Sequence, residues 1–115
     1  MIKKNYLDVI AEEVTLANST GVSVRWLIRE EDGAFRYAMR RFEINPGGQI
    51  GLHSHAEEHE IYVLSGKGEI LEGPGSKTIV TQGDVLYISP YEEHGYKNLG
   101  KDTFVFLCII PLLTK

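Results

Sequence analysis

Residues 47–66 read Gly47-Gly-Gln-Ile-Gly-Leu-His53-Ser-His55-Ala-Glu-Glu-His59-Glu-Ile-Tyr-Val-Leu-Ser-Gly66. Three histidines fall within seven residues of this stretch. In a β-strand, side chains two residues apart point to the same face and stand about 6.5–7 Å from each other, so His53 and His55 can converge on one metal ion. His59 opens the next apolar run, and its imidazole reaches the same place if that run pairs antiparallel with the strand before it.

The chain has four histidines, and the fourth, His94, follows Pro90 after a further predicted hairpin. A lone strand histidine is usually a surface residue or a hydrogen-bonded core residue. Burying several imidazoles without partners would cost a few kcal/mol each, so a cluster of this density needs another explanation. A solvated polar loop is one alternative, because Glu57 and Glu58 flank the cluster. We interpret it as a metal site with four ligands: His53, His55, His59 and His94.

The rest of the chain repeats one pattern, a short apolar run followed by a turn rich in Gly, Pro or Asn. The spacing of about 8–12 residues is typical of an all-β sandwich or barrel. Glycine supplies positive φ at such corners and proline presets φ. The predicted turns are residues 45–48, 65–68, 73–75, 82–84, 89–90 and 98–100.

Alternation within the runs predicts which side chains face the interior. In residues 22–29, one face carries Val22, Val24, Trp26 and Ile28. In residues 35–44, the inward face carries Ala38, Arg40, Phe42 and Ile44, while Met39, Arg41 and Glu43 are expected to face solvent. The pattern therefore places one cation, Arg40, among inward apolar residues.

Bulk properties exclude several classes of function. The 115 residues suit one domain, and the net charge of −4 without basic runs argues against a nucleic-acid partner. The most apolar stretch, residues 104–113, is half as long as a membrane-spanning helix and contains Pro111. Residues 1–13 do not form a signal peptide, and a single cysteine, Cys108, suits a reducing compartment. We expect no membrane partner and a cytoplasmic location.

The histidine stretches resemble a known family, the cupins. Gly47-x5-His53-x-His55-x3-His59-x6-Gly66 is similar to the first cupin motif, except that His59 stands where most members have glutamate. The segment from Gly83 to Asn98 resembles the second motif, with His94 at the ligand position. The corner before His94 is one residue shorter than usual and has Glu92 in place of glycine.

The chain is more similar still to the small tetra-histidine, manganese-binding cupins, from about Val22 onward. This resemblance implies a double-stranded β-helix (jelly-roll) barrel spanning residues 1–115 as one domain. Residues 31–115 would form the barrel, and residues 1–30 would form N-terminal strands that serve as an arm in a homodimer. The resemblance alone favours Mn²⁺, since imidazole ligands also suit Fe²⁺, Zn²⁺, Ni²⁺ and Cu²⁺.

Three residues are pocket candidates beside the metal: Arg40, Tyr96 and Phe106. As a buried cation, Arg40 requires a partner, which is either a substrate carboxylate or an internal acid. Phe106 suits a pocket wall or plain core equally well. Glu60 has the opposite parity to His59, so it is expected to point away from the ion.

Four neutral imidazoles leave coordination positions open, which favours catalysis over a closed structural site. The first hypothesis is a metal-dependent oxygenase acting on a small organic substrate. The second is a non-redox isomerase or lyase, which requires a general base, and Tyr96 or Glu92 is the nearest candidate. The third is a non-catalytic module that binds a small molecule. The fold class alone does not distinguish these three functions.

Overall fold

The computed structural model describes residues 1–113 and is almost wholly β. Its helices are three single 3-10 turns: η1 (Tyr6–Asp8), η2 (Leu16–Asn18) and η3 (Glu30–Asp32). None of the helices in the described part of the chain is long and apolar enough to span a membrane. The strands are β1 (Ala11–Glu13), β2 (Thr20–Ile28), β3 (Tyr37–His53), β4 (His59–Ser65), β5 (Lys67–Leu71), β6 (Lys77–Thr81), β7 (Val85–Ile88), β8 (His94–Asn98) and β9 (Phe104–Pro111).

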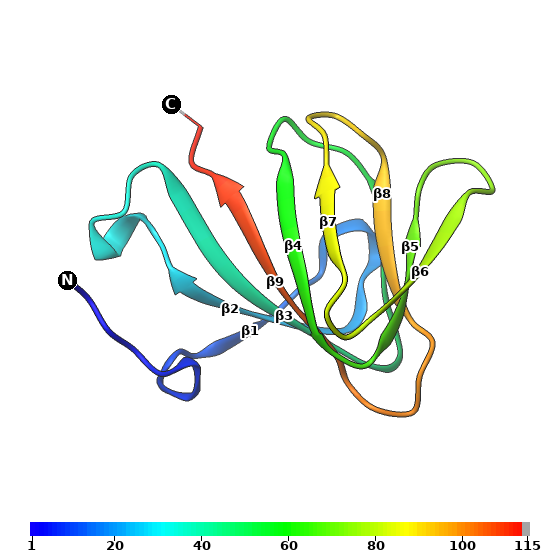
Figure 1. Cartoon of the computed structure of the whole chain (residues 1–115), viewed down its shortest axis with the longest axis horizontal. Helices are drawn as coiled ribbons and strands as arrows, with labels where there is room; N and C mark the ends of the chain where they lie inside the picture. The colour runs from blue at the N-terminus through cyan, green and yellow to red at the C-terminus, as the bar shows by residue number, and fades with distance from the viewer. Residues whose placement is uncertain (114–115) are drawn as a thin grey trace.

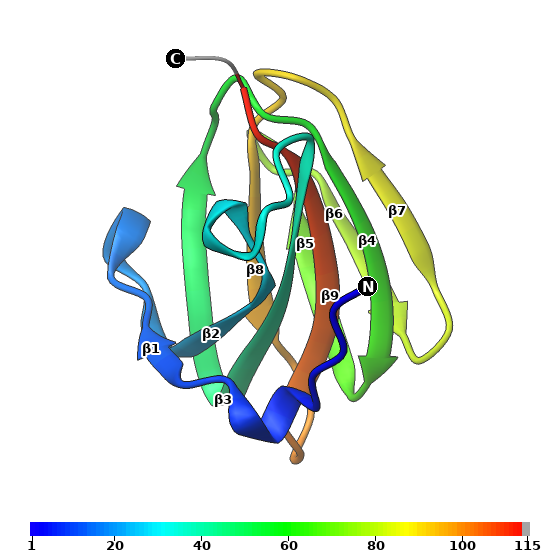
Figure 2. The same ribbon diagram turned by 90° about the vertical axis from the view of Figure 1, so that its left-hand side faces the viewer.

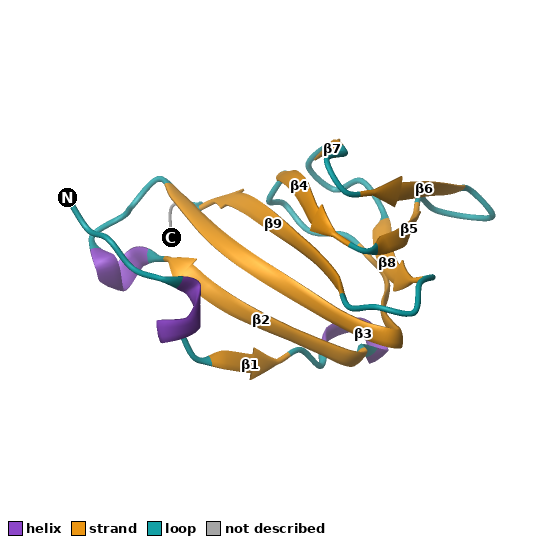
Figure 3. Ribbon diagram, turned by 60° about the horizontal axis from the view of Figure 1, so that its bottom comes forward, coloured by secondary structure: helices purple, strands orange, loops and turns teal. Residues whose placement is uncertain are grey.

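All strands belong to one antiparallel sheet that curls on itself (Figures 1 and 3). Its order is β6-β5-β8-β3-β9-β4-β7, and β2 also pairs with β3 and carries β1. The long strand β3 joins the two halves of the sheet. Its first half pairs with β2 and β9, and its end pairs with β8. The all-β expectation is therefore confirmed.

The predicted turn at residues 45–48 is wrong, because β3 continues through it from Tyr37 to His53. The glycines bend the strand instead of ending it: Gly47 has a φ of 81°, which a residue with a side chain rarely adopts. A Cβ on Gly48 would lie 2.8 Å from the carbonyl oxygen of Thr20. This bend carries β3 from β9 to β8 and so brings His53 beside His94.

The hydrophobic core fills the space inside the curled sheet, as period-2 alternation predicts. Along β3, Ala38, Phe42 and Ile44 are buried between less buried neighbours. Phe106 on β9 is fully buried, and its ring stacks on Phe42 with ring centroids 5.2 Å apart. Phe104, Cys108 and Ile110 continue the same inward face of β9.

The face predicted for Ile28 is wrong. The pairing of β2 with β3 shifts between Trp26, which faces Arg40, and Ile28, which faces Met39. Directly paired residues share a face, and Met39 lies on the opposite face of β3 from Arg40. The bulge at Leu27 therefore turns Ile28 outward, an effect that alternation alone does not reveal.

The outer face of β3 is also less exposed than predicted. Residues 1–9 cross it, with the Arg41 guanidinium 4.0 Å from the centre of the Tyr6 ring. Arg25 donates a hydrogen bond to the Val9 carbonyl (2.6 Å), and Arg41 pairs with Glu43 at 2.9 Å. Figure 2 shows the N-terminal segment beside β2 and β3. The N-terminal residues therefore cover polar groups of the sheet, and their use as a dimer arm stays a prediction.

Candidate metal centre

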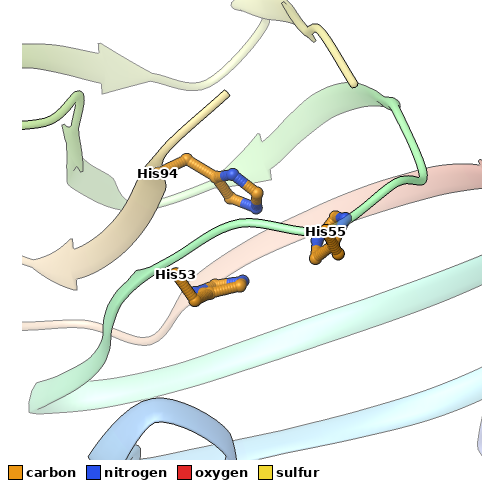
Figure 4. A group of neighbouring side chains, drawn as sticks. All are labelled: His53, His55 and His94. Atoms are coloured by element: carbon orange, nitrogen blue, oxygen red, sulfur yellow. The ribbon is translucent and has the colours of Figure 1, made fainter. Parts of the chain in front are cut away.

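The four histidines come from different elements that meet at one end of the barrel. His53 is the last residue of β3 and pairs directly with His94, the first residue of β8. His59 begins β4. His55 lies in the loop between β3 and β4. Figure 4 shows the rings of His53, His55 and His94 grouped around a common space.

The route by which His55 and His59 reach this space differs from the predicted one. His55 lies outside a strand, so the i and i+2 geometry does not apply to it. Strand β4 pairs with β7 and β9, not with β3, and β9 lies between β3 and β4. The curl of the sheet and the short loop of residues 54–58 bring His59 back to the cluster.

The ring nitrogens lie close enough to share one ion. Ligand nitrogens of His53, His55 and His94 all lie within 4.8 Å of one another. The Nε2 atoms of His55 and His59 are 3.0 Å apart, and the centroids of the His59 and His94 rings are 5.0 Å apart. The structure thus places all four predicted residues together.

Backbone carbonyls orient two of the rings. The Nδ1 atom of His53 lies 2.8 Å from the Gly51 carbonyl oxygen, and that of His94 lies 2.8 Å from the Glu92 carbonyl oxygen. Because a carbonyl only accepts, each Nδ1 carries the proton and each Nε2 presents a lone pair. The Nε2 of His94 is buried without a hydrogen-bond partner. Such an orphaned lone pair, with the opposite nitrogen held by a carbonyl, fits a metal ligand.

Burial keeps the imidazoles of His53, His59 and His94 neutral. Loss of solvent lowers the pKa of His59 to about 2, with the nearby Arg40 cation adding to the effect. Burial likewise lowers the pKa of His94 to about 4 and lowers that of His53. A metal binds only the deprotonated nitrogen, so these three histidines are ready to bind at neutral pH. Neutral imidazoles suit a divalent transition metal.

Arg40 faces the interior, as predicted. Its Nη2 lies 3.1 Å from the Cys108 sulfur and 3.5 Å from the His59 Nδ1. Its guanidinium carbon lies 5.2 Å from the centre of the Trp26 ring and 4.8 Å from that of Phe42. No salt bridge within residues 1–113 includes Arg40, so the internal acid is missing from the described structure.

Tyr96 and Phe106 lie behind His94. Tyr96 is buried, its ring stacks on Phe106 at 4.9 Å, and its centroid is 5.8 Å from that of His94. Burial raises the pKa of Tyr96 well above its usual value, so its phenol keeps its proton and does not serve as a base. Phe106 has no exposed surface and belongs to the core.

The corner before His94 explains the unusual second motif. Tyr91 adopts a φ of 63° in this shortened turn. The carboxylate of Glu92 accepts a hydrogen bond from the Ser89 amide at 2.9 Å, and the residue is exposed. The predicted role of Glu92 as a general base is therefore not supported, because its side chain closes the turn. Its backbone carbonyl instead orients His94.

The carboxylates near the cluster differ in whether they point toward it. Glu60 is exposed next to the buried His59, which confirms that it points away from the site. The sequence placed Glu57 only beside the cluster, whereas in the structure its carboxylate lies 3.7 Å from the His55 Nδ1. The spacing His55-x-Glu57 is the only signal for this contact, and it depends on a loop conformation. Glu57 also lines an open cavity of about 600 Å³ together with Trp26, Glu30, Phe35, Ile110, Pro111, Leu112 and Leu113.

The model of the cupin domain matches residues 40–110, which include all four histidines and Arg40. The chain is a cupin. The jelly-roll barrel expected from its motifs is confirmed by its solved neighbours.

Among solved structures, the cupin is similar to the polyketide cyclase RemF from Streptomyces resistomycificus. That match has a TM-score of 0.92 and 33% identity, and it covers 98% of this chain and 80% of RemF. A predicted oxalate decarboxylase from Thermotoga maritima gives a TM-score of 0.85 at 26% identity, with 97% of this chain and 100% of that chain covered.

Sequence relatives give a similar picture. The cupin is 36% identical to the oxalate-binding protein of Thermotoga maritima over 74 residues, which are 64% of this chain and 60% of the relative. It is 38% identical to the glucose-6-phosphate isomerase of Pyrococcus furiosus over 65 residues, which are 52% of this chain and 34% of that enzyme. The chain thus matches less than two thirds of the length of each of these two relatives.

Proposed function

We propose that this cupin is a metal-dependent enzyme that acts on a small organic substrate by a non-redox reaction. The observation that carries the proposal is the orphaned Nε2 of His94 within a cluster of inward-facing imidazoles. Two residues of the adjoining cavity, Trp26 and Glu57, contact Arg40 and His55 of the site. A site of this kind combines metal ligands with space for a small molecule.

The choice of a non-redox reaction rests on the relatives. RemF is named a polyketide cyclase, and the Pyrococcus furiosus relative is named an isomerase. Ring closure and isomerisation both require a carbonyl to be polarised and a proton to be moved. We therefore place the oxygenase hypothesis from the sequence second, and an oxygen electrode separates the two.

The proposed roles follow from position. His53, His55, His59 and His94 hold one divalent ion, with Mn²⁺ favoured by the family resemblance. When bound, such an ion supplies Lewis acidity toward a carbonyl or carboxylate oxygen. Glu57 is the carboxylate that borders both the cavity and the site, so we assign it as the general base. Tyr96 retains its proton behind His94 and helps to exclude water.

The first test is the metal content of the purified protein, measured by mass spectrometry. We expect about one transition-metal ion per chain in the wild type and its loss in His59→Ala and His94→Ala. Glu60→Gln is the matched control, because Glu60 follows His59 directly but is exposed. Absence of metal from the wild type, even after incubation with each ion in turn, would refute the proposal.

The second test concerns the reaction. Small polyketide-like diketones and sugar phosphates are offered to the metal-loaded protein under argon and under air. We expect turnover without oxygen and a loss of roughly 100-fold or more in Glu57→Gln, the usual contribution of a general base, with metal content retained. Turnover that requires and consumes oxygen would instead establish the oxygenase.

A further inference from the structure

Within residues 1–113, no carboxylate pairs with the Arg40 cation inside the barrel. Among residues 1–113 the buried polar or charged residues are His59, His94 and Asn98, and none of them is a carboxylate. The Nε of Arg40 is itself buried without a hydrogen-bond partner. A divalent ion on neutral imidazoles would add further positive charge beside it. The interior therefore has an excess of positive charge that a bound anion would balance.

The surroundings of Arg40 suit recognition rather than mere packing. Its guanidinium lies against Trp26 and Phe42, which hold its plane in place. Its neighbours through Nη2 are a thiol and an imidazole nitrogen, both weak partners for a cation. A planar guanidinium with unused donors matches the two oxygens of a carboxylate or an enolate.

Arg40 contacts the ring of Trp26, and Trp26 in turn lines the open cavity. Its walls include the apolar side chains of Trp26, Phe35 and Leu112, which suit an aromatic or unsaturated body. Its other lining residues include two carboxylates, Glu30 and Glu57. A second negative charge on a ligand would lose its hydration against these apolar walls and would find no cation among the lining residues to replace it.

We propose that Arg40 binds the single anionic group of the substrate, a carboxylate or an enolate, whose apolar body lies against Trp26. This names the substrate class of the proposed enzyme and rests on that function. The substrate is a monoanion with an apolar body, and molecules with a second charge at the far end are excluded.

Trp26 is the only tryptophan of the chain, so its fluorescence reports on this cavity directly. The probe is 3-phenylpropanoate, titrated into Mn²⁺-loaded and into metal-stripped protein, with calorimetry as a second readout. Two analogues vary one feature each: 3-phenylpropanamide lacks the charge, and 3-(4-carboxyphenyl)propanoate adds a distal charge. The variants are Arg40→Gln and Arg40→Lys. Arg41→Gln is the matched control, since Arg41 is the next residue and lies on the outer face.

We expect Arg40→Gln to weaken binding of 3-phenylpropanoate at least tenfold, which corresponds to about 1.4 kcal/mol. Arg40→Lys should restore part of the affinity, and Arg41→Gln should leave it unchanged. Both analogues should bind the wild type at least tenfold more weakly. Circular dichroism and thermal melting show whether each variant is folded. If Arg40→Gln does not fold, Arg40→Lys is compared with the wild type in its place.

Equal affinity for 3-phenylpropanoate and its amide would overturn the inference, as would unchanged affinity in folded Arg40→Gln. The proposed function fails separately, through absence of metal or of turnover. Arg40-dependent anion binding in a protein that holds no metal would keep the inference and refute the enzyme. Bound metal and turnover in a protein that does not prefer the anion over its amide would support the proposed enzyme and refute the inference about Arg40.

Discussion

His59 differs from the other histidines of the cluster in what surrounds its Nδ1 atom. Carbonyl oxygens hold the Nδ1 atoms of His53 and His94, whereas the Nδ1 of His59 lies 3.2 Å from the Cys108 sulfur. Burial raises the pKa of the Cys108 thiol, so the sulfur stays neutral. A thiol sulfur is a weak hydrogen-bond partner, and the Arg40 guanidinium 3.5 Å from the same nitrogen only donates, so no carbonyl fixes the tautomer of His59 as it does for His53 and His94.

The depressed histidine pKa values predict how the metal-free protein responds to pH. Unfolded histidine has a pKa near 6.5, whereas in the folded chain the pKa of His94 is about 4 and that of His59 is lower still. Below pH 6.5 the unfolded state binds protons that the folded state does not, so stability is complete above this pH and falls as pH decreases. At pH 5 the lowered pKa of each of these two histidines reduces the free energy of unfolding by about 2 kcal/mol.

The measurement is a series of urea or thermal unfolding curves of metal-stripped protein between pH 7.5 and pH 5. This window lies above the usual pKa values of carboxylates, so their contribution is small. His94→Leu should show a shallower dependence on pH than the wild type. A wild-type midpoint that does not move across the window would contradict the prediction.

Close contacts between neighbouring strands determine which glycines the barrel requires. Gly68 on β5 pairs with Val80 and Asn98, and a Cβ at this position would lie 2.3 Å from the ring of Phe104. That ring is fully buried in the core. The glycine is therefore needed for close packing, not for an unusual φ.

We predict that Gly68→Ala destabilises the protein by roughly 1–3 kcal/mol, the usual cost of overpacking a core. Gly100→Ala is the control, because its nearest atoms would lie 3.6 Å or farther from the new Cβ and no positive φ is involved. The two variants are compared by denaturant unfolding. Equal stability of the two would show that β5 moves to make room.

For the whole molecule, the expected homodimer is the property that remains to be tested. The first sixteen residues expose several large apolar side chains, of which Leu7 is 67% and Ile10 is 81% exposed. Exposed apolar surface concentrated in one segment is typical of an interaction site. This agrees with a dimer arm in residues 1–30, while β2 remains paired to β3 of its own chain.

We predict that light scattering gives about 26 kDa, twice the chain mass of 12.9 kDa. The double substitution Leu7→Glu and Ile10→Glu should shift the protein to the monomer. Val85→Glu, at a 70% exposed position on β7, should leave the dimer intact. A monomeric wild type at all concentrations would remove the dimer from consideration.

Much of the site could be predicted because it depends on local pattern. The spacing of His53, His55 and His59 follows a family motif, and the inward position of Arg40 follows from alternation along one strand. Glu57 could not be predicted, because its contact with His55 depends on the conformation of a loop. Nor could the outward turn of Ile28, which results from a bulge.

The sequence by itself determined the all-β class, the cupin family and the four histidines of the site. Period-2 alternation and the spacing of the histidine motifs involve residues that are close in sequence, so both can be recognised without the fold. Only the tertiary structure decided that β9 separates β3 from β4, and that no acid of the described chain pairs with Arg40. These features depend on contacts between residues far apart in the chain, and the curl of the sheet selects those contacts.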